Sequence, residues 1–498
     1  MKLDAVIHIG SSQFRLVIAE FFTDRGYRVI DSSEKMIPLG KDVFTGGFVQ
    51  LRTMNMAIEI LKHFKEQLKG WNVRPEDVKV IATSALREAK NRDAFLDRVE
   101  VRTGFRIKVV DGIEEIRLSY MAVQYALEGV QTKLSRTNAI IIGVGGGSTE
   151  VILLRRGKMA AVHSLSLGAV RVEQQILNDS GHLGENLENF LTQNMRPQLE
   201  RLDSEMRLSS IRTIVAIGSY AKMISENLPK NEDERYQICS NDKFHKTSNH
   251  IFEGSSLREE GYKAAIGILK LFVLATTANE IIIPDVSVDE GVFVDVKGLA
   301  DNTLRERYSR QIVASAISLG KKYNYDMAHA RHVTKLGLSL FDQLTEEHGL
   351  KERSRLLLEV GSILHDIGTF VKSSGHHKHG MYLVLNSEIF GLNEIELKVV
   401  ANLVRYHRKN PPQSNHTAYT SLNREHRLIV LKLASILRVA DALDRGHAQR
   451  IRSIKVDRSH DRLIIHCDHQ GDISVERFSL SAKAAMFEDV FGLKVLLR

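Results

Sequence analysis

Apolar and polar residues follow two different periodicities along the first 300 positions. Short apolar runs that end in glycine or polar residues are typical of buried strands, whereas apolar residues recurring every three or four positions predict helices. We therefore expect strands at 3–10, 14–22, 27–31, 78–83 and from 138 onwards, and helices at 50–69, 91–103 and 114–128. Intermixed strands and helices of this kind indicate an α/β fold.

The rhythm changes near residue 304, where an almost uninterrupted helical pattern begins. It lasts to about residue 450, and short strands then lead to a closing helix at 481–491. Polar turns interrupt the first half of the chain at 23–26 and 155–157. We predict two α/β lobes, an all-α domain and a small C-terminal α+β piece, at 1–122, 123–303, 304–450 and 451–498.

One segment of the first lobe is echoed in the second. Residues 7–18 read IHIGSSQFRLVI and residues 142–153 read IGVGGGSTEVIL, and the two align without a gap at an offset of 135. Each consists of an apolar strand, a turn of glycine and serine, and a second apolar strand. A duplicated unit predicts two related lobes that face one another, although two similar hairpins also arise by chance.

Composition narrows the class of protein without identifying it. The chain has 498 residues, 43% hydrophobic and 26% charged, as in globular rather than disordered or fibrous proteins. No run approaches the ~20 apolar residues of a membrane span. Because the N-terminal MKLDAVIHIG enters a strand pattern at once, we expect a cytoplasmic protein with no membrane partner. Cys239 and Cys467 match no zinc or redox spacing.

The net charge of the chain indicates which kind of ligand it favours. The formal net charge of +8 favours an anionic ligand such as a polyphosphate or a nucleic acid. The chain contains no recognised nucleic-acid-binding motif, so we do not expect a nucleic acid partner. Of the 20 histidines, 6 lie in residues 1–300 and 14 in residues 301–498. This skew predicts a different chemistry after residue 300.

The duplicated turns are the first candidate site. Glycine lets the backbone approach a ligand, and the N–H groups of a tight turn point into one concavity that suits phosphate oxygens. Serine and threonine hydroxyls add donors. A single glycine-rich turn is more often structural, but two at duplicated positions favour a phosphate clamp. Its residues are Ser11, Ser12, Gly145, Gly146, Gly147, Ser148 and Thr149.

Several longer segments resemble the exopolyphosphatase / guanosine pentaphosphate phosphohydrolase (Ppx/GppA) family. They occur in family order and are IGSSQFRLVI, IATSALREAKN, VDGIEEIRLSYMAV, VGGGSTEVIL, SLSLGAVRVEQQ, HDIG and VRYHRKNPP. The resemblance covers nearly the whole chain. It implies a two-lobed fold of the actin-like ATPase and sugar-kinase type, an HD-type helical domain, and release of terminal phosphate from inorganic polyphosphate or a guanosine polyphosphate. We also expect a homodimer.

The functional residues of the family carry over position by position. Glu115 matches the catalytic glutamate, which implies a general base that takes a proton from the attacking water. Arg87 matches an arginine that binds phosphate oxygens in pairs. The glycine-serine turns match the phosphate-binding turns. Glu150 follows the second turn as a candidate metal ligand, and Arg171 belongs to the matching LGAVR segment as a phosphate ligand.

Several positions depart from the family pattern, among them Ser12 and Gln13, where the pattern has asparagine and serine. The pattern has an aspartate where this chain has His8 and Gly143, and an arginine where it has Asp289. The two aspartates are the groups expected to hold Mg²⁺, which prefers carboxylate and water oxygens. Their loss leaves open a weakened phosphatase, a cation held through Glu150, or a site that binds polyphosphate or an alarmone without hydrolysis. The intact Glu115 favours retained hydrolysis, so we expect an enzyme that uses Mg²⁺ at this cleft.

The helical region carries a second candidate site. Four residues occur there in the order His, His-Asp, Asp: His332, His365, Asp366 and Asp441. This order resembles that of the HD metal-dependent phosphohydrolase superfamily. Imidazole and carboxylate groups together chelate a divalent ion that activates water. We expect Mn²⁺, Fe or another divalent ion, with His379 and His407 as further ligands.

The histidines and aspartates of this second site also have explanations that involve no metal. A His-Asp pair is common, and histidines at 329 and 332 also fit one surface face of a helix. An HD-type hydrolase acting on a nucleotide or phosphodiester is therefore the alternative to a polyphosphatase.

Overall fold

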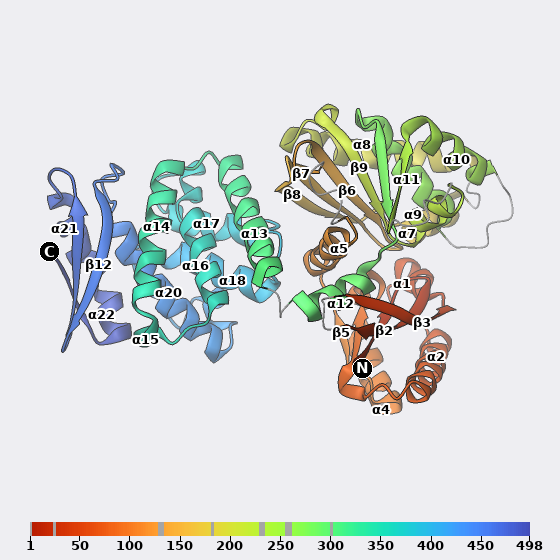
Figure 1. Ribbon diagram of the computed structural model, residues 1–498, viewed down its shortest axis with the longest axis horizontal. Coiled ribbons are helices and arrows are strands. Elements are labelled where there is room, and N and C mark those ends of the chain that lie inside the picture. The colour runs from red at the N-terminus through yellow and green to blue at the C-terminus, as the bar shows by residue number, and fades with distance from the viewer. Residues whose placement is uncertain are drawn as a thin grey trace. The chain divides into compact units, whose positions relative to one another are not determined.

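The computed structural model of the protein describes residues 2–22, 26–127, 134–180, 184–228, 235–253, 261–298 and 302–498. It divides into two compact units, Met1–Glu306 and Arg307–Arg498 (Figure 1). The finer division into four parts stays a prediction. Most of the turn expected at 23–26 lies outside the described residues. In the part of the chain that is described, no helix is both long and apolar enough to cross a membrane.

Lobe I, the first part of unit 1, is built on a five-stranded sheet in the order β3-β2-β1-β4-β5. β1 (Lys2–Ile9), β2 (Gln13–Phe21) and β3 (Tyr27–Met36) form an antiparallel meander, and β4 (Val78–Ala82) and β5 (Ile107–Val109) extend it in parallel. β3 runs past its predicted end because it pairs with β2 along its whole length. The helices are α1 (Leu39–Gly46), α2 (Leu51–Gly70), α3 (Ser84–Glu88), α4 (Arg92–Thr103) and α5 (Gly112–Ala126).

Lobe II completes unit 1 with a six-stranded sheet in the order β10-β11-β9-β6-β7-β8. β6 (Asn138–Val144), β7 (Thr149–Arg155) and β8 (Lys158–Leu165) form a second antiparallel meander. β9 (Ile211–Ile217) and β11 (Glu280–Pro284) continue in parallel, and β10 (Tyr236–Ser240) is an antiparallel edge strand. The helices are α7 (Ala169–Ser180), α8 (Gly184–Glu205), α9 (Ser219–Glu226), α10 (Asn241–Glu253), α11 (Tyr262–Ala275) and α12 (Val288–Gly298).

The two sheets repeat one topology, as the sequence echo predicts. β1, β2 and β4 correspond to β6, β7 and β9. The register agrees as well: His8 is the partner of Arg15 across β1 and β2, and Gly143 is the partner of Glu150 across β6 and β7. The second pair is the first moved by the same offset of 135 residues. The predicted two-lobed α/β fold is therefore confirmed for unit 1.

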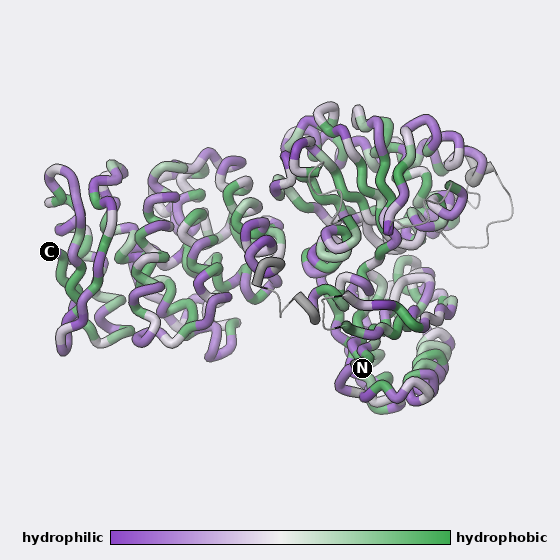
Figure 2. The backbone as a smooth tube through the Cα atoms, viewed as in Figure 1, coloured by the Kyte–Doolittle hydropathy of each residue, from purple (hydrophilic) through white to green (hydrophobic). Residues whose placement is uncertain are grey.

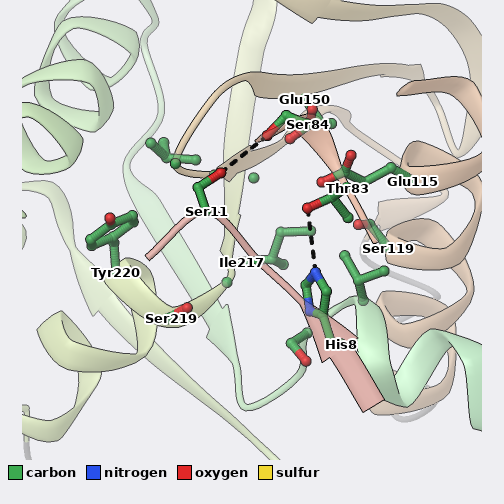
Figure 3. A pocket seen from close by; sticks show the side chains of 18 of the residues that line it. His8, Ser11, Thr83, Ser84, Glu115, Ser119, Glu150, Ile217, Ser219 and Tyr220 are labelled. Carbon is green, nitrogen blue, oxygen red and sulfur yellow. Dashed lines mark hydrogen bonds between the residues drawn. The ribbon is translucent and has the colours of Figure 1, made fainter. Parts of the chain in front are cut away.

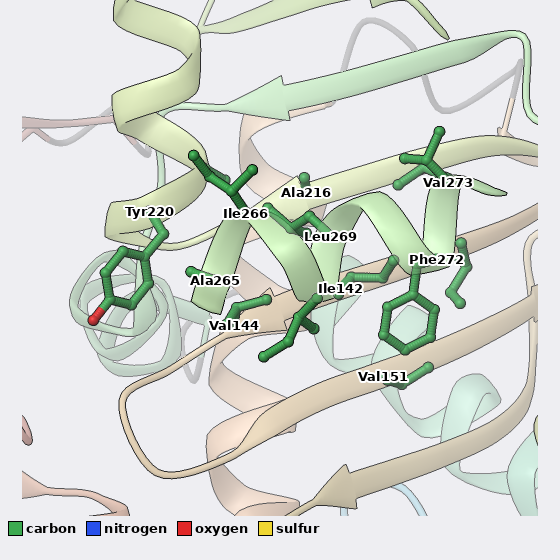
Figure 4. Close-up of a cluster of buried hydrophobic side chains, with 14 of the residues drawn as sticks. Ile142, Val144, Val151, Ala216, Tyr220, Ala265, Ile266, Leu269, Phe272 and Val273 are labelled. Carbon is green, nitrogen blue, oxygen red and sulfur yellow. The ribbon is translucent and has the colours of Figure 1, made fainter. Parts of the chain in front are cut away.

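An apolar core between sheet and helix holds lobe II together (Figure 4). Ile142 on β6 and Val151 on β7 are fully buried with Ile266, Leu269 and Phe272 of α11. In Figure 2 the strands of this sheet are largely hydrophobic. Because the duplicated strands are anchored in this way, the turn between them is held by a rigid support.

α5 and α12 pack tightly against each other inside unit 1. Phe293 of α12 covers one face of the lobe I sheet, and α5 also contacts β7 and β8 of lobe II. At Gly291 the helices approach so closely that a Cβ would lie 2.1 Å from the carbonyl oxygen of Leu118. The Arg117 guanidinium on α5 donates two hydrogen bonds to Asp295 on α12, at 2.6 and 3.0 Å.

Unit 2 is mainly helical and ends in a small α+β piece. α13 (Asn302–Lys322) leads into it. The helices that follow are α14 (Met327–Gln343), α15 (Thr345–His348), α16 (Glu352–Leu364), α17 (His376–Leu385), α18 (Glu394–Tyr406), α19 (Thr417–Thr420) and α20 (Arg424–Ala442). The final sheet has the order β12-β13-β14, with strands β12 (Ile451–Ser459), β13 (Arg462–His469) and β14 (Lys494–Leu497).

The closing helix expected at 481–491 is wrong in detail. The structure has two helices, α21 (Ser474–Lys483) and α22 (Ala485–Phe491), followed by β14. The sequence pattern misses β14 because this strand has only four residues and is defined by parallel pairing with the distant β13.

Replacing Gly291 by alanine should push α12 away from α5, because the new Cβ would overlap the Leu118 carbonyl. We expect a loss of about 1–3 kcal/mol in the free energy of unfolding, the usual cost of overpacking, measured by chemical denaturation. Gly70→Ala is the matched control, since nothing lies within 4 Å of a Cβ at that position. Equal losses in both variants would contradict the close contact.

Candidate functional sites

A cavity lies where the two lobes of unit 1 meet (Figure 3). Lobe I contributes the end of β1 and the segments after β1 and β4, α5 contributes Glu115, and lobe II contributes the turn after β6 and the start of α9. Seven serine and threonine side chains line it: Ser11, Ser12, Thr83, Ser84, Ser119, Ser219 and Ser287. A cavity so rich in hydrogen-bond donors suits an oxyanion.

Strand direction explains why these groups meet. β1 is parallel to β4, and β6 is parallel to β9, so the carboxyl ends of each pair open onto one edge of the sheet. Ligands of open α/β sheets bind outside the carboxyl ends of the strands. A Cβ at Gly146 would lie 2.6 Å from that of Ser11, so glycine lets the two duplicated turns touch. Both turns therefore face the same cavity.

Glu115 is buried in the first turn of α5 and borders the cavity. Asp111 fixes this turn by accepting a hydrogen bond from the N–H of Glu114. An Arg87 guanidinium nitrogen lies 3.3 Å from Glu115 Oε2. Burial raises the pKa of Glu115, and the positive charges of Arg87 and His8 only partly oppose that rise. A carboxyl group of raised pKa beside an oxyanion cavity is suited to general base chemistry.

The neighbouring Glu114 has a structural role. Its carboxylate pairs with Arg117 on the same helix and with Lys108, and it does not line the cavity. Burial opposes ionisation, but hydrogen bonds and charges from Arg117 and Lys108 lower the pKa of Glu114 to about 2. The two adjacent acids therefore differ in environment although they are identical in residue type.

Glu150 also lines the cavity and lies on β7, near Glu115 (Figure 3). It accepts a hydrogen bond from Ser148 Oγ at 2.6 Å and one from Ser164 Oγ at 3.3 Å. Burial, reinforced by the charge of Glu115, raises the pKa of Glu150 to about 8. Glu150 therefore holds a proton at neutral pH, and a cation that used it as a ligand would have to displace that proton.

The predicted phosphate clamp divides into residues that line the cavity and residues that support the turn. Those in the lining are Ser11, Ser12, Gly145 and Gly146. Those behind it are Gly147, Ser148, Thr149 and Arg171. Arg171 Nε donates to the Gly147 carbonyl at 2.8 Å, and its terminal nitrogen pairs with Glu88 of lobe I at 2.6 Å. Arg171 thus ties the second turn to the first lobe.

His8 and Asp289 form a charged pair at the cavity. His8 Nδ1 lies 2.9 Å from Asp289 Oδ1, and Arg15 donates to Asp289 Oδ2 at 3.2 Å. Burial disfavours the charged form of each, but their mutual attraction outweighs it. The pKa of His8 is therefore raised, and that of Asp289 is lowered. His8 Nε2 lies 3.4 Å from Thr83 Oγ1 (Figure 3).

The residues of this cavity do not fit the Mg²⁺ ion expected from the sequence. Asp289 is 1% exposed and engaged by two basic side chains, and His8 and Gly143 supply no carboxylate. In unit 1, as far as it is described, no three His, Cys, Asp or Glu ligand atoms lie within 4.8 Å of one another. Mg²⁺ is held by a near-octahedral set of oxygens, including carboxylates. Apart from the engaged Asp289, the acids in the described lining are Glu115 and the protonated Glu150.

Unit 2 contains a buried cluster of a very different kind. His365 Nε2 lies 3.2 Å from His329 Nε2, and His329 Nε2 lies 3.6 Å from Asp441 Oδ1. Asp366 faces this group through Oδ2, at 3.6 Å from His365 Nε2. The ligand atoms of His329, His365 and Asp441 are close enough together to hold one metal ion, and Asp366 forms a further such group with His329 and His447. The first three residues come from α14, the end of α16 and the end of α20.

A second group adjoins the first through the same aspartate. Asp366 Oδ1 lies 3.1 Å from His376 Nε2 and 3.4 Å from His407 Nε2, and the two imidazoles are stacked. In His365, His376 and His407, Nδ1 is within 2.9 Å of a backbone carbonyl oxygen. That contact makes Nδ1 the protonated nitrogen and leaves the Nε2 lone pair for a metal.

Two of the predicted metal ligands are corrected by this geometry. His332 does not join the cluster, and His329 takes its place. The buried face of α14 runs through Val333, Leu336 and Leu340, which puts position 329 on the same stripe and position 332 beside it. Likewise His379 is replaced by His376, because His376 and not His379 shares the buried face of α17.

Sequence reasoning missed several residues of both sites. Thr83 and Ser84 reach the cavity because β4 ends there, and the TSAL segment after an apolar run carries the only signal of that. The pairing of Asp289 with His8 has no local signal, since 281 positions separate the two residues. Lys483, which bonds to the Asp441 carboxylate, lies on α21 and is equally remote from the predicted ligands.

Comparison with known proteins gives family matches over both units of the chain. Residues 22–298 match the Ppx/GppA phosphatase family, and residues 312–485 match Ppx/GppA phosphatase, domain III. A guanosine-5'-triphosphate,3'-diphosphate pyrophosphatase from Photobacterium profundum is 23% identical over 447 residues, which cover 88% of this chain and 85% of that protein.

The solved structures match a share of this chain that is about as long as unit 1. An exopolyphosphatase from Cytophaga hutchinsonii gives a TM-score of 0.52 at 21% identity, over 59% of this chain and 98% of that chain. A Ppx/GppA family member from Aquifex aeolicus gives a TM-score of 0.47 at 24% identity, over 60% of this chain and 99% of that chain. The likeness to the Cytophaga structure, together with the duplicated sheets, confirms the predicted two-lobed, actin-like fold.

Replacing Glu150 by glutamine should change how stability depends on pH. The pKa of Glu150 is about 8 against a usual 4.5, so this group favours the folded chain fully below about pH 4.5, and that contribution is lost as the pH rises through 8. A glutamine at this position does not titrate, so the variant does not lose this stability as the pH rises. Between about pH 5 and about pH 9, the variant should gain as much as about 4 kcal/mol in unfolding free energy relative to wild type.

Chemical denaturation in EDTA at several pH values measures this difference. Glu188→Gln, at an exposed position on α8, is the matched control and should follow wild type. Parallel pH curves for wild type and Glu150→Gln would show that Glu150 is ionised at neutral pH.

Proposed function

Because the chain belongs to the Ppx/GppA phosphatase family, we propose that it releases terminal phosphate from inorganic polyphosphate and guanosine pentaphosphate at the cavity of unit 1. The observation that carries the proposal is Glu115. It is a buried carboxyl group of raised pKa at the edge of a cavity that two glycine-serine turns and seven serine and threonine side chains line. A general base and a set of oxyanion donors are what such a hydrolysis needs.

The reaction is an in-line attack of water on the terminal phosphorus. Glu115 takes a proton from the attacking water as the new P–O bond forms. The bond to the bridging oxygen breaks, and the shortened chain leaves with that oxygen. Hydroxyl groups of Ser11, Thr83 and Ser84 and the N–H groups of the turns donate hydrogen bonds to the phosphoryl oxygens. Arg87 holds Glu115 in orientation through their 3.3 Å contact.

Two further observations support the substrate class. The similar Photobacterium protein is named for a guanosine polyphosphate, and the similar Cytophaga protein for polyphosphate. Both compounds are polyanions with phosphoanhydride bonds, and the net charge of +8 favours polyanions. A cytoplasmic homodimer is part of the same proposal, which cell fractionation and analytical ultracentrifugation test.

Glu115→Gln should lower phosphate release by about a hundredfold to ten-thousandfold, the usual contribution of a general base. Glutamine keeps the size of the side chain but cannot accept the proton from water. The measurement is release of inorganic phosphate from long-chain polyphosphate and from guanosine pentaphosphate. Glu114→Gln is the matched control: the same change one residue away, outside the cavity, should leave turnover within about twofold.

The rate of wild type should rise with pH on its acidic side, above the usual glutamate range, because the pKa of Glu115 is raised and its ionised form is the base. Undiminished turnover in Glu115→Gln would remove Glu115 from the mechanism. Loss of turnover in both glutamine variants would indicate a damaged fold.

We propose a second hydrolytic centre in unit 2, favoured by the convergence of Nε2 atoms on Asp366. The residues that would hold a divalent metal are His329, His365, Asp366 and Asp441, with His376 and His407 beside Asp366. Such an ion polarises a phosphoryl oxygen and makes bound water more acidic. Without a metal, burial of His329 is outweighed by hydrogen bonds to Asp441 and Asp444 and by the charge of Asp441, which raise the pKa of His329 to about 9, so a bound ion would displace a proton from this residue.

Positive side chains surround the same cluster. Lys483 bonds to Asp441, and Arg408 lies 3.2 Å from His376 Nε2. Both are suited to bind a phosphoester substrate beside the metal ligands. A nucleotide or phosphodiester is the substrate class that this centre favours.

Asp366→Asn should lower the bound metal at least about tenfold, because Asp366 faces both groups of histidines and an amide cannot replace its charge. Metal content after dialysis against Mn²⁺ or Fe²⁺, measured by mass spectrometry, tests this expectation. His332→Gln is the matched control and should retain the metal, since His332 lies outside the cluster. Equal metal content in wild type and Asp366→Asn would contradict the centre.

A further inference from the structure

A histidine and an aspartate meet at the cavity of unit 1. Position 8 carries histidine and position 289 carries aspartate. The structure brings the two positions together, because His8 Nδ1 lies 2.9 Å from Asp289 Oδ1. The contact joins β1 to α12 and places a basic side chain in the lining of the cavity.

Asp289 is not available to an external cation. It is 1% exposed, its Oδ1 faces His8, and its Oδ2 accepts from Arg15 at 3.2 Å. It is further held by Ser287, whose hydroxyl accepts from the Asp289 N–H at 3.3 Å. A further cation approaching this carboxylate would also meet the positive charges of its two partners, which repel it.

His8 presents its other nitrogen to the cavity. The side chain is 21% exposed and lines the cavity, and Nε2 lies 3.4 Å from Thr83 Oγ1 (Figure 3). With a carboxylate against Nδ1, the imidazolium form has an N–H at Nε2 that can donate to a ligand. Thr83 lies next to Ser84, so this N–H adjoins the hydroxyl groups that would surround a phosphate.

We propose that the His8 imidazolium is the cation that binds a phosphoryl oxygen in this cavity, so that the cavity binds phosphate without a divalent metal. Asp289 is its positioning residue. The inference deepens the proposed function and rests on it for the identity of the ligand as a terminal phosphate. It accounts for the absence of carboxylates at positions 8 and 143, since a cavity with its own cation has no need of groups that hold a metal.

The charged groups that face His8 come from several elements. They are Asp289 on α12, Glu115 on α5 and Arg15 on β2. Arg87 and Glu150 act on Glu115, and Glu290 acts on Arg15. Glu150 holds a proton at neutral pH, because its pKa is about 8. Against the effect of burial, Asp289 and Glu115 raise the pKa of His8, and a phosphate adds a further negative charge on its open side.

Binding of inorganic phosphate to the full chain, followed by calorimetry in excess EDTA and then in excess MgCl₂, tests the proposal. Wild type should bind with affinities that agree within about threefold in the two media. His8→Gln should bind at least tenfold more weakly in EDTA, because glutamine is uncharged. His63→Gln, an exposed histidine on α2, is the matched control and should bind as wild type does.

The positioning role of Asp289 is tested with sulfate, which stays doubly charged across the pH range of interest. Sulfate affinity of wild type should fall as the pH rises and His8 loses its proton. In Asp289→Asn the same fall should begin at lower pH, because the carboxylate no longer stabilises the imidazolium. A purely structural role of Asp289 would lower affinity equally at all pH values and leave the profile in place.

Two results would overturn the proposal: phosphate binding by wild type that weakens tenfold or more in EDTA, or wild-type affinity in His8→Gln with an unchanged melting temperature. The outcome is distinct from that of the proposed function. If the chain releases no phosphate from polyphosphate but binds phosphate through His8 in EDTA, the proposed hydrolysis fails and this inference stands. If turnover depends on Glu115 but phosphate binding does not change in His8→Gln, the proposed hydrolysis stands and this inference fails.

Discussion

The close approach of α12 to α5 is the contact on which the cavity of unit 1 depends. Gly291 leaves no room for a Cβ against the Leu118 carbonyl, so the two helices share one fixed separation. α5 carries Glu115, and α12 carries Asp289 two residues before that glycine. One packing contact therefore sets where the general base stands and where the partner of His8 stands. The chemistry of the cavity follows from the packing of side chains that never touch a substrate.

The buried charges of this cavity are arranged so that each has a partner of opposite sign. Glu115 lies beside Arg87, and Asp289 lies between His8 and Arg15. An unpaired buried charge costs far more free energy than a paired one, which explains why Glu150, held by serine hydroxyls, keeps its proton. An incoming phosphate thus meets hydroxyl groups and the imidazole of His8, with the carboxyl group of Glu115 in the lining of the same cavity.

Much of the fold could be predicted from the sequence because it is encoded locally. The echo between residues 7–18 and 142–153 predicted the duplicated strand pairs, and the structure shows that their registers agree as well. The sites were harder, because they depend on faces and on distant contacts. Position 329 rather than 332 belongs to the buried histidine and aspartate cluster because it shares the buried face of α14 with Val333 and Leu336. The approach of Asp289 to His8 needs the whole lobe to be folded, and no periodicity in the chain indicates it.

Histidine takes opposite roles in the two units, and its neighbours decide which. His8 has a carboxylate at Nδ1 and a hydroxyl group and open cavity at Nε2; its pKa is raised, and its protonated form can donate from Nε2. His365 has the Ser362 carbonyl at Nδ1 and another imidazole at Nε2, and burial lowers its pKa to about 4, so it stays neutral with a lone pair to offer. The first arrangement is suited to an anion and the second to a cation. The concentration of histidine after residue 300 therefore marks where metal chemistry is favoured, while His8 marks where a metal is replaced.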